Sequence, residues 1–234
     1  MLKSIKYHIF LIGLFCTFSN CIIANTNNIP VNISDEYAPQ GVESACNPDC
    51  PETPFPPVQH WLPDVLITLP NGCQVFVQYT TRFACNMWHD LYIARITAAN
   101  SNDPICNNYF STTGAAQIMA DVTIQMLKQN PMGFPPSNNG ECESNWRVIK
   151  GACWQKLNIN WGSVTQPNQA YRLYPCLGDI CCLDRYQVCL IGQERVITSL
   201  PGGVQGTCIP QETQPHSLGC EVVCGNSSSG GGGN

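Results

Sequence analysis

Cysteine is the residue type whose number and spacing in this chain could carry chemistry most directly. The 234-residue sequence contains 16 cysteines. Cys16 and Cys21 fall in an N-terminal segment that we expect to be removed, which leaves fourteen in the mature chain. Thiolates bind metals or exchange electrons in reducing surroundings and form disulfides in oxidising ones. The fourteen candidate site residues are Cys46, Cys50, Cys73, Cys85, Cys106, Cys142, Cys153, Cys176, Cys181, Cys182, Cys189, Cys208, Cys220 and Cys224.

Short spacings between some cysteines are compatible with a zinc site, for which two Cys-x₂₋₄-Cys knuckles are usual. Cys46 with Cys50 and Cys220 with Cys224 have this spacing, and Cys181-Cys182 and Cys189 are further candidates. In an exported chain, oxidising conditions remove the thiolates that zinc needs, and the even number favours up to seven disulfides. We therefore expect disulfides of undetermined pairing, and no metal or other cofactor.

Cys181 and Cys182 are adjacent, and two arrangements remain open for them. They could bridge each other in a strained, reducible ring. Alternatively, each could pair with a different distant cysteine, because neighbours on a strand point to opposite faces of a sheet. We favour the second arrangement.

Histidines that could act as general bases are few. The mature chain retains only His60, His89 and His216, and it lacks both the Gly-x-Ser-x-Gly and the His-Glu-x-x-His motif. His89 and Asp90 are neighbours on an expected strand, so their side chains should diverge. We assign no catalytic residue on this basis.

Two pairs of acidic residues, with a cysteine or cysteines between them, are the candidates for carboxylate chemistry. Glu141 and Glu143 flank Cys142, while Asp179 and Asp184 flank Cys181-Cys182. Glycoside hydrolysis needs two acids facing each other across a cleft. We interpret these four as solvated loop acids instead.

Five tryptophans could stack on sugars or anchor a partner. They could equally pack in the core beside disulfides, as the adjacency of Cys153 and Trp154 indicates. We favour the core for each of them. The tryptophans are Trp61, Trp88, Trp146, Trp154 and Trp161.

The N-terminus has the pattern of an export signal. Lys3 and Lys6 precede a short apolar run, and Ala24 offers a small residue at which cleavage could occur. We expect a signal peptide over residues 1–24, and the run is too short to span a bilayer. A lipid anchor on Cys21 is the alternative.

The mature chain is acidic and poorly charged. Charged residues make up 12% of the sequence, about half of the usual fraction. Loss of Lys3 and Lys6 changes the formal charge from −5 to −7. This balance, without a run of Lys or Arg, argues against a nucleic-acid partner and against an anionic membrane surface.

Composition divides the mature chain into three parts. Residues 25–59 are rich in proline and are expected to form an extended lead-in. A domain over 60–224 follows, and residues 225–234 form a Ser/Gly tail expected to be flexible.

The domain carries strand signals in its first half. Residues 64–69 read as a strand, Asn71-Gly72 as a turn, and two runs of period-two alternation follow, separated by a reversal at Cys85-Asn86. We predict a three-stranded antiparallel meander over roughly 64–97.

A helix is expected after this meander. Apolar residues recur at three- and four-residue spacing from Ala115 to Met126. The N-cap could be Ser111, Thr112 or Thr113. Asn130-Pro131 ends the pattern. Further on, we predict short strands at 146–149, 171–174, 186–190 and 195–200. The fold class is therefore α+β: an antiparallel sheet with one main packed helix, stapled by disulfides.

One stretch resembles a known group of proteins. Asn71-Gly72-Cys73, the following Val-x-Val-x-Tyr, and Arg82-x-Ala84-Cys85-Asn86 are similar to cysteine-rich secreted proteins of Bacteroidetes/Chlorobi-type bacteria. The resemblance covers roughly residues 60–98. It implies a bacterial extracellular or cell-surface setting, but no activity and no functional residues.

Three functions are compatible with these observations. The first, which we favour, is a secreted or cell-surface structural or binding module, with a surface protein or polysaccharide as partner. The second is an extracellular hydrolase with a dispersed active site. The third is a thiol-redox or metal-binding protein, which would require free cysteines.

Overall fold

The computed structural model describes residues 62–100, 102–163, 166–176, 181–204, 206 and 219–224, all within one compact unit. The side chains of 159–163, 166–170 and 204 are outside this description. The expected signal peptide (1–24), lead-in (25–59) and tail (225–234) also lie outside the described residues. The expected domain at 60–224 contains everything discussed below.

The first three strands follow one another as antiparallel neighbours. They are β1 (Val65–Thr68), β2 (Gln74–Ala84) and β3 (Trp88–Ala98). The β1–β2 turn places Gly72 at φ 89°, and the β2–β3 turn places Cys85 and Asn86 at φ 51° and 52°. Both reversals therefore occur where the turn signals of the sequence indicate them.

Two helices follow, where the sequence analysis expected one. Helix α3 (Ala115–Gln129) has the expected apolar stripe, which is buried, and it ends at Asn130 in the left-handed conformation. Helix α2 (Pro104–Thr112) was not predicted, although Asp103 caps it and Pro104 begins it. The expected cap of α3 at 111–113 is wrong because these residues end α2.

The second half of the chain is almost entirely strand. The strands are β4 (Cys142–Gly151), β5 (Cys153–Ser163), β6 (Gln166–Pro175), β7 (Cys181–Ile191), β8 (Glu194–Val204) and β9 (Glu221–Val222). The four short strands predicted here each lie inside a longer one. Strands β5 and β9 were not predicted.

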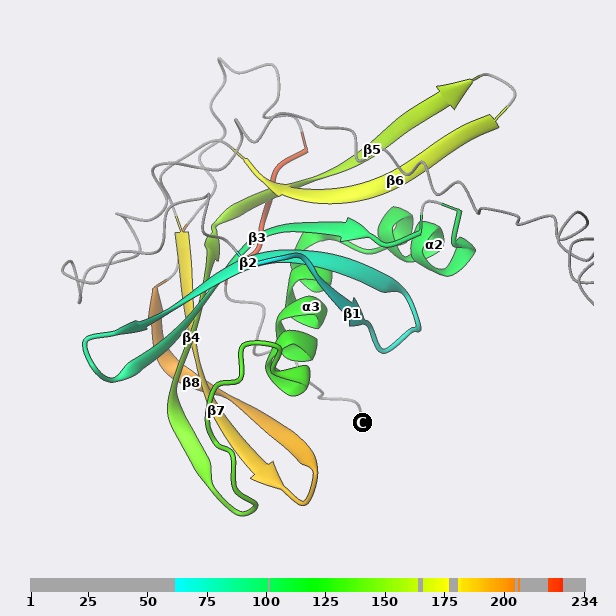
Figure 1. Ribbon diagram of the computed structural model, residues 1–234. Coiled ribbons are helices and arrows are strands. Elements are labelled where there is room, and N and C mark those ends of the chain that lie inside the picture. Colours follow the sequence, from blue (N-terminus) through cyan, green and yellow to red (C-terminus); the bar gives the residue numbers. More distant parts are fainter. Residues whose placement is uncertain are drawn as a thin grey trace, which may run out of the picture. The chain divides into compact units, whose positions relative to one another are not determined.

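The nine strands form one sheet, whose central path runs β8-β7-β4-β3-β6-β5-β9, with β2 and β1 attached at β3 (Figure 1). Strand β3 pairs with β4 through its first half, in parallel, and with β6 through its second half. The sheet curls around α3, which packs against both β1 and β8. A simple meander therefore does not describe the sheet, and the pairing of β3 with three strands is the reason.

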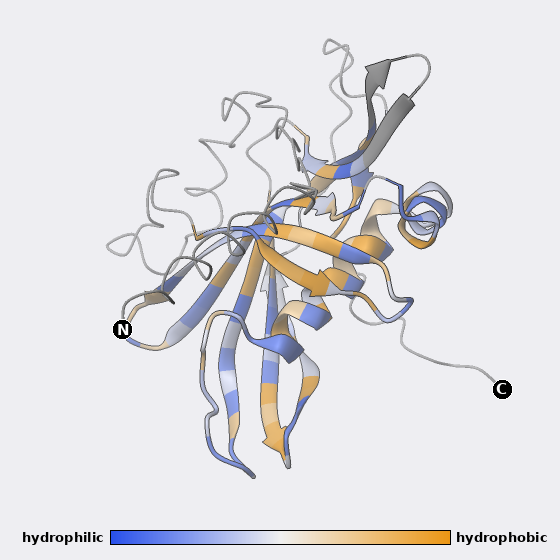
Figure 2. Ribbon diagram, turned by 45° about the vertical axis from the view of Figure 1, so that its right-hand side comes forward, coloured by the Kyte–Doolittle hydropathy of each residue, from blue (hydrophilic) through white to orange (hydrophobic). Residues whose placement is uncertain are grey.

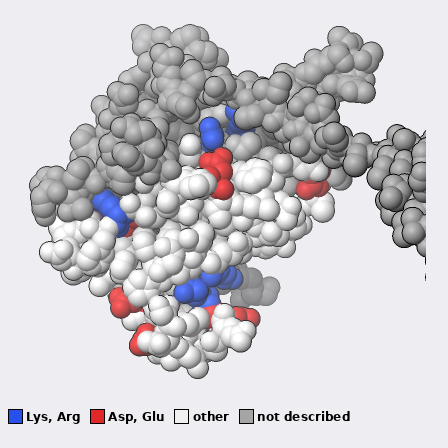
Figure 3. Space-filling view, viewed as in Figure 1, with Lys and Arg blue, Asp and Glu red and all other residues white. Residues whose placement is uncertain are grey.

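The main core lies between the sheet and α3. It contains apolar residues from one face of β2 and β3, such as Val75, Val77, Leu91 and Ile93, and the apolar side of α3 (Figure 2). A smaller buried cluster lies apart from this core, formed by Tyr92, Ala94, Ile149, Cys181 and Leu183. The face seen in Figure 3 carries only scattered charges in its described part, as expected from the low charged fraction.

Helices α2 and α3 are both too short to cross a bilayer, and the described residues contain no helix that is long and apolar enough to do so.

Candidate functional site

Four disulfides join cysteines that lie 33 to 47 residues apart in sequence. They are Cys73–Cys106, Cys142–Cys189, Cys176–Cys220 and Cys182–Cys224. Cys85, Cys153 and Cys181 are disulfide-bonded as well, so every cysteine in the described part of the chain is oxidised. Cys46, Cys50 and Cys208 lie outside this part.

The cysteine clusters that suggested zinc are divided among different bridges. Cys182 pairs with Cys224, Cys220 pairs with Cys176, and Cys189 pairs with Cys142. The adjacent residues Cys181 and Cys182 therefore do not bridge each other. In the described ranges, His, Cys, Asp and Glu side chains form no group of three that could hold a metal ion.

The C-terminal bridges also position a helix cap. Glu221 lies on β9, between two disulfide-bonded cysteines, and its Oε2 accepts a hydrogen bond of 2.7 Å from the backbone N–H of Ala115. A carboxylate at this position satisfies an N–H group that the first turn of α3 leaves without an intrahelical partner. The segment around β9 is thus tied to the start of α3 by a charged contact.

His89 lies in an aromatic stack. Its ring centroid is 5.1 Å from that of Phe83 and 5.0 Å from that of Phe134, which meets Trp146 edge to face. Burial lowers the pKa of His89, while Glu143 and Asp90 partly oppose this shift. The side chain thus packs among rings, and His60 and His216 lie outside the described residues.

The four acids considered for carboxylate chemistry have different surroundings. Glu141 is exposed and accepts hydrogen bonds from Asn138, and Glu143 is half-buried on β4. Asp184 was expected to be a solvated loop acid, which is wrong: it lies on β7, is 5% exposed and pairs with the Lys150 ammonium group. Asp179 lies outside the described residues.

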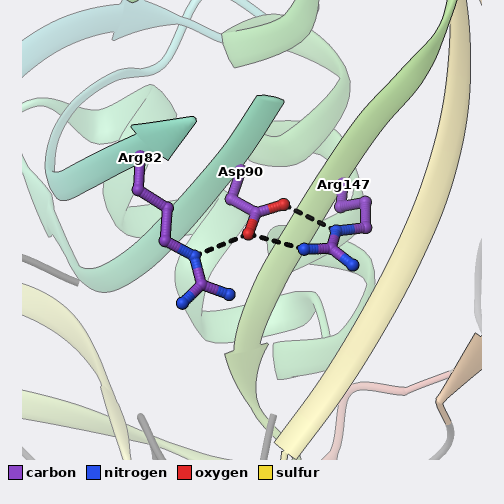
Figure 4. A network of polar contacts seen from close by, with 3 residues as sticks. All are labelled: Arg82, Asp90 and Arg147. Atoms are coloured by element: carbon purple, nitrogen blue, oxygen red, sulfur yellow. Dashed lines mark hydrogen bonds and ion pairs between the residues drawn. The ribbon is translucent and has the colours of Figure 1, made fainter. Parts of the chain in front are cut away.

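A second buried ion network connects β2, β3 and β4 (Figure 4). The fully buried carboxylate of Asp90 lies between two guanidinium groups, and it accepts from Arg82 Nε at 2.7 Å. Arg147 donates to it through Nε at 2.6 Å and through Nη2 at 2.8 Å. Bidentate, charge-assisted contacts of this kind fix geometry strongly.

The strand register explains why these charges meet. Asp90 is the Cα partner of Arg82 on β2 and of Arg147 on β4. The sequence contained one usable signal, because Arg82 and Asp90 stand at similar distances from the turn at Cys85-Asn86. The contribution of Arg147 could not be anticipated, because parallel pairing of β3 with β4 has no local sequence signal.

The tryptophans divide between core and network. Trp146 and Trp154 are buried, and their indole N–H groups donate to the carbonyls of Pro135 and Gly151, respectively. These two confirm the core interpretation. Trp88 is half-buried, with the Cζ atoms of Arg147 and Arg185 at 4.7 and 4.9 Å from its ring centroid. Trp61 and the side chain of Trp161 lie outside the description.

Helix α2 borders an open hollow on the surface. Tyr109, one of its lining residues, donates its hydroxyl to Asp121. Burial and this hydrogen bond raise the pKa of Tyr109, so the phenol stays protonated. The lining residues are Asn71, Pro104, Ile105, Asn108, Tyr109 and Thr112.

Comparison with known proteins adds no family to these observations. No protein-family model, no curated protein and no solved structure matches the chain.

Proposed function

We propose that this protein is a secreted or cell-surface structural or binding module that performs no reaction of its own. The observation that carries this proposal is the oxidised state of the cysteines: all those in the described part form disulfides, four of them with both partners described. Disulfides of this density are typical of proteins that work in oxidising, extracellular surroundings.

The surroundings of the reactive groups support a binding role over catalysis. Asp90 and Asp184 are paired with basic side chains, and His89 is half-buried between two aromatic rings. Catalytic acids and bases need access to a substrate within hydrogen-bond reach. The two acids instead link neighbouring strands through ion pairs, and His89 packs against aromatic side chains.

Two assays on the purified, oxidised protein test the proposal. Incubation with panels of polysaccharides, esters and peptides should give no turnover above that of buffer. Labelled protein added to cells of the source organism should remain on their surface after washing, whereas the same protein after reduction and alkylation should not. Turnover of any substrate class, or equal retention of the native and the reduced protein, would contradict the proposal.

A further inference from the structure

Four charged residues form one row across four neighbouring strands. Arg82 on β2, Asp90 on β3, Arg147 on β4 and Arg185 on β7 are successive Cα partners, so their side chains leave the same face of the sheet. Asp90 accepts three hydrogen bonds from Arg82 and Arg147. Arg185, at the end of the row, is more than one strand away from that carboxylate.

Arg185 differs from the other members of the row in its partners. Its guanidinium group stacks on Trp88, next to that of Arg147, and it makes no ion pair with any residue that the structure describes. Its Nε is buried and has no hydrogen-bond acceptor there. A buried N–H of a charged group without an acceptor costs free energy that an incoming acceptor would recover.

Strand β8 has a bulge with two glycines beside Arg185. The pairing of β7 with β8 shifts register between Leu183 and Arg185, where Pro201, Gly202 and Gly203 form a bulge. Gly202 has φ +90°, and a Cβ built on it would lie only 3.3 Å from Nη1 of Arg185. A side chain at Gly202 would therefore press against this end of the guanidinium group.

We propose that Arg185 binds an oxyanion, such as the carboxylate, sulfate or phosphate group of a ligand, against the indole of Trp88. Guanidinium groups recognise oxyanions through paired N–H donors, and Nε with one Nη nitrogen presents such a pair. Arg147, which Asp90 holds in place, adds positive potential beside the site. This inference rests on the proposed binding function and names the chemical class of its ligand.

Because the whole chain is negatively charged, binding of an oxyanion at a specific site can be distinguished from general electrostatic attraction of anions. The formal charge is −5, so the protein as a whole repels anions. Affinity for an oxyanion must then come from the local arrangement of guanidinium groups. It should saturate and should weaken as ionic strength rises.

Titration with simple anions tests the site. Sodium sulfate, sodium phosphate and sodium acetate are added separately to the oxidised protein, against sodium chloride at equal ionic strength. The readout is the indole N–H signal of Trp88 in ¹H–¹⁵N spectra, assigned with Trp88→Phe, together with the midpoint of thermal unfolding. The rank of the three anions identifies the preferred oxyanion.

Arg172 provides a matched control variant. The Nε of Arg172 is also buried without an acceptor among the described residues, and its Nη1 donates to the Tyr174 hydroxyl. Arg185, in contrast, stacks on Trp88 beside Arg147. Arg172→Gln should bind the anion as the natural sequence does. Arg185→Gln should lose roughly tenfold or more in affinity, and Arg185→Lys, which keeps the charge, should fall between them.

Two results would overturn the inference: no saturable shift of the Trp88 signal with any of the anions up to about 100 mM, or an equal affinity in Arg185→Gln. Loss of binding in both Arg185→Gln and Arg172→Gln would also overturn it, because it would indicate a diffuse effect of charge. A failed titration leaves the turnover and surface-retention assays unaffected, so failure of this site and failure of the proposed function are separable.

Discussion

The effect of a buried charged side chain on stability depends on whether its counter-charge is present. Asp90 and Asp184 are 0% and 5% exposed, and each accepts hydrogen bonds from basic side chains on neighbouring strands. A buried ion pair adds little net stability compared with an apolar replacement, but the loss of one partner leaves the other charge uncompensated. These networks should therefore respond strongly to single substitutions and weakly to paired ones.

The Lys150–Asp184 pair allows this to be measured. Asp184→Asn should lower the free energy of unfolding by about 3–5 kcal/mol, because the Lys150 ammonium group stays buried without its counter-charge. The double variant Lys150→Met/Asp184→Leu should recover most of this loss. Urea unfolding with intact disulfides measures both effects. A double variant that is as unstable as Asp184→Asn would show that packing, and not charge, dominates.

His89 should make stability depend on pH. Burial lowers its pKa in the folded protein, so the folded state holds this proton less tightly than the unfolded chain. The contribution is fully present above the unfolded pKa of about 6.5, and it is lost as pH falls below that value. His89→Phe, which keeps an aromatic ring between Phe83 and Phe134, should remove this component. Urea unfolding at several pH values compares the two slopes, and identical slopes would contradict the assignment.

The burial of single residues was predictable from sequence where it depends only on their apolar character. The stripe on α3 and the burial of Trp146 and Trp154 follow from the hydrophobic effect acting on local patterns. Asp184 could not be predicted, because its burial depends on Lys150 reaching it across two strands that are distant in the chain. Arg185 was missed for the same reason.

At the scale of elements, the segment around β9 caps the start of α3. Strand β9 has only two residues paired with β5, yet it carries Glu221 to the start of α3. Two disulfides hold this segment, Cys176–Cys220 on one side of Glu221 and Cys182–Cys224 on the other. Helix α3 therefore depends on bridges that lie far from it in sequence.

Comparing two bridges with similar loop lengths can separate the effect of a disulfide on the cap of α3 from its effect on the entropy of the unfolded chain. Cys182–Cys224 and Cys142–Cys189 span 42 and 47 residues, so each should contribute roughly 4 kcal/mol through loop entropy. Only the removal of Cys182–Cys224, by paired Cys→Ala substitution, should also loosen the cap. Amide hydrogen exchange at Ala115 to Ile118 should then accelerate.

The Cys142–Cys189 bridge is the control because its cysteines are direct partners on β4 and β7, which other pairs also hold together. Its removal should leave exchange at the start of α3 unchanged. Equal acceleration in both variants would mean that global unfolding, and not release of β9, controls these amides.

Elements whose ends have distinctive turn residues were identified, whereas two elements with weaker or overlooked local signals, α2 and β5, were missed. The turns at Gly72 and Cys85-Asn86 and the end of α3 at Asn130 have residues suited to positive φ. Strand β5 was missed although Leu157, Ile159 and Trp161 alternate with Asn158 and Asn160 in its sequence. Its pairing with β6 could not be read from this pattern, because period-two alternation indicates a strand but not its neighbour.

At the scale of the whole molecule, the fold depends on long-range connections. The central strand β3 pairs with β2, β4 and β6, and the described disulfides span 33 to 47 residues. Local sequence patterns do not reveal which strands pair or which cysteines are bridged. The number of cysteines indicates only that disulfides exist. The α+β class was therefore predictable, whereas the strand order was not.

The oxidation state of all the cysteines is the property on which the proposed localisation and the proposed function both depend. If cleavage follows Ala24, the mature protein begins at Asn25 and contains fourteen cysteines. Seven disulfides would make its intact mass about 14 Da lower than that of the reduced form, because each bridge removes two hydrogen atoms. Mass spectrometry with and without reduction, after blocking of free thiols, measures this directly. Blocked thiols, an added lipid on Cys21 or bound zinc would contradict the assignment of an oxidising compartment or of a cleaved signal peptide. The cysteines outside the described residues would then be the first place to look for chemistry.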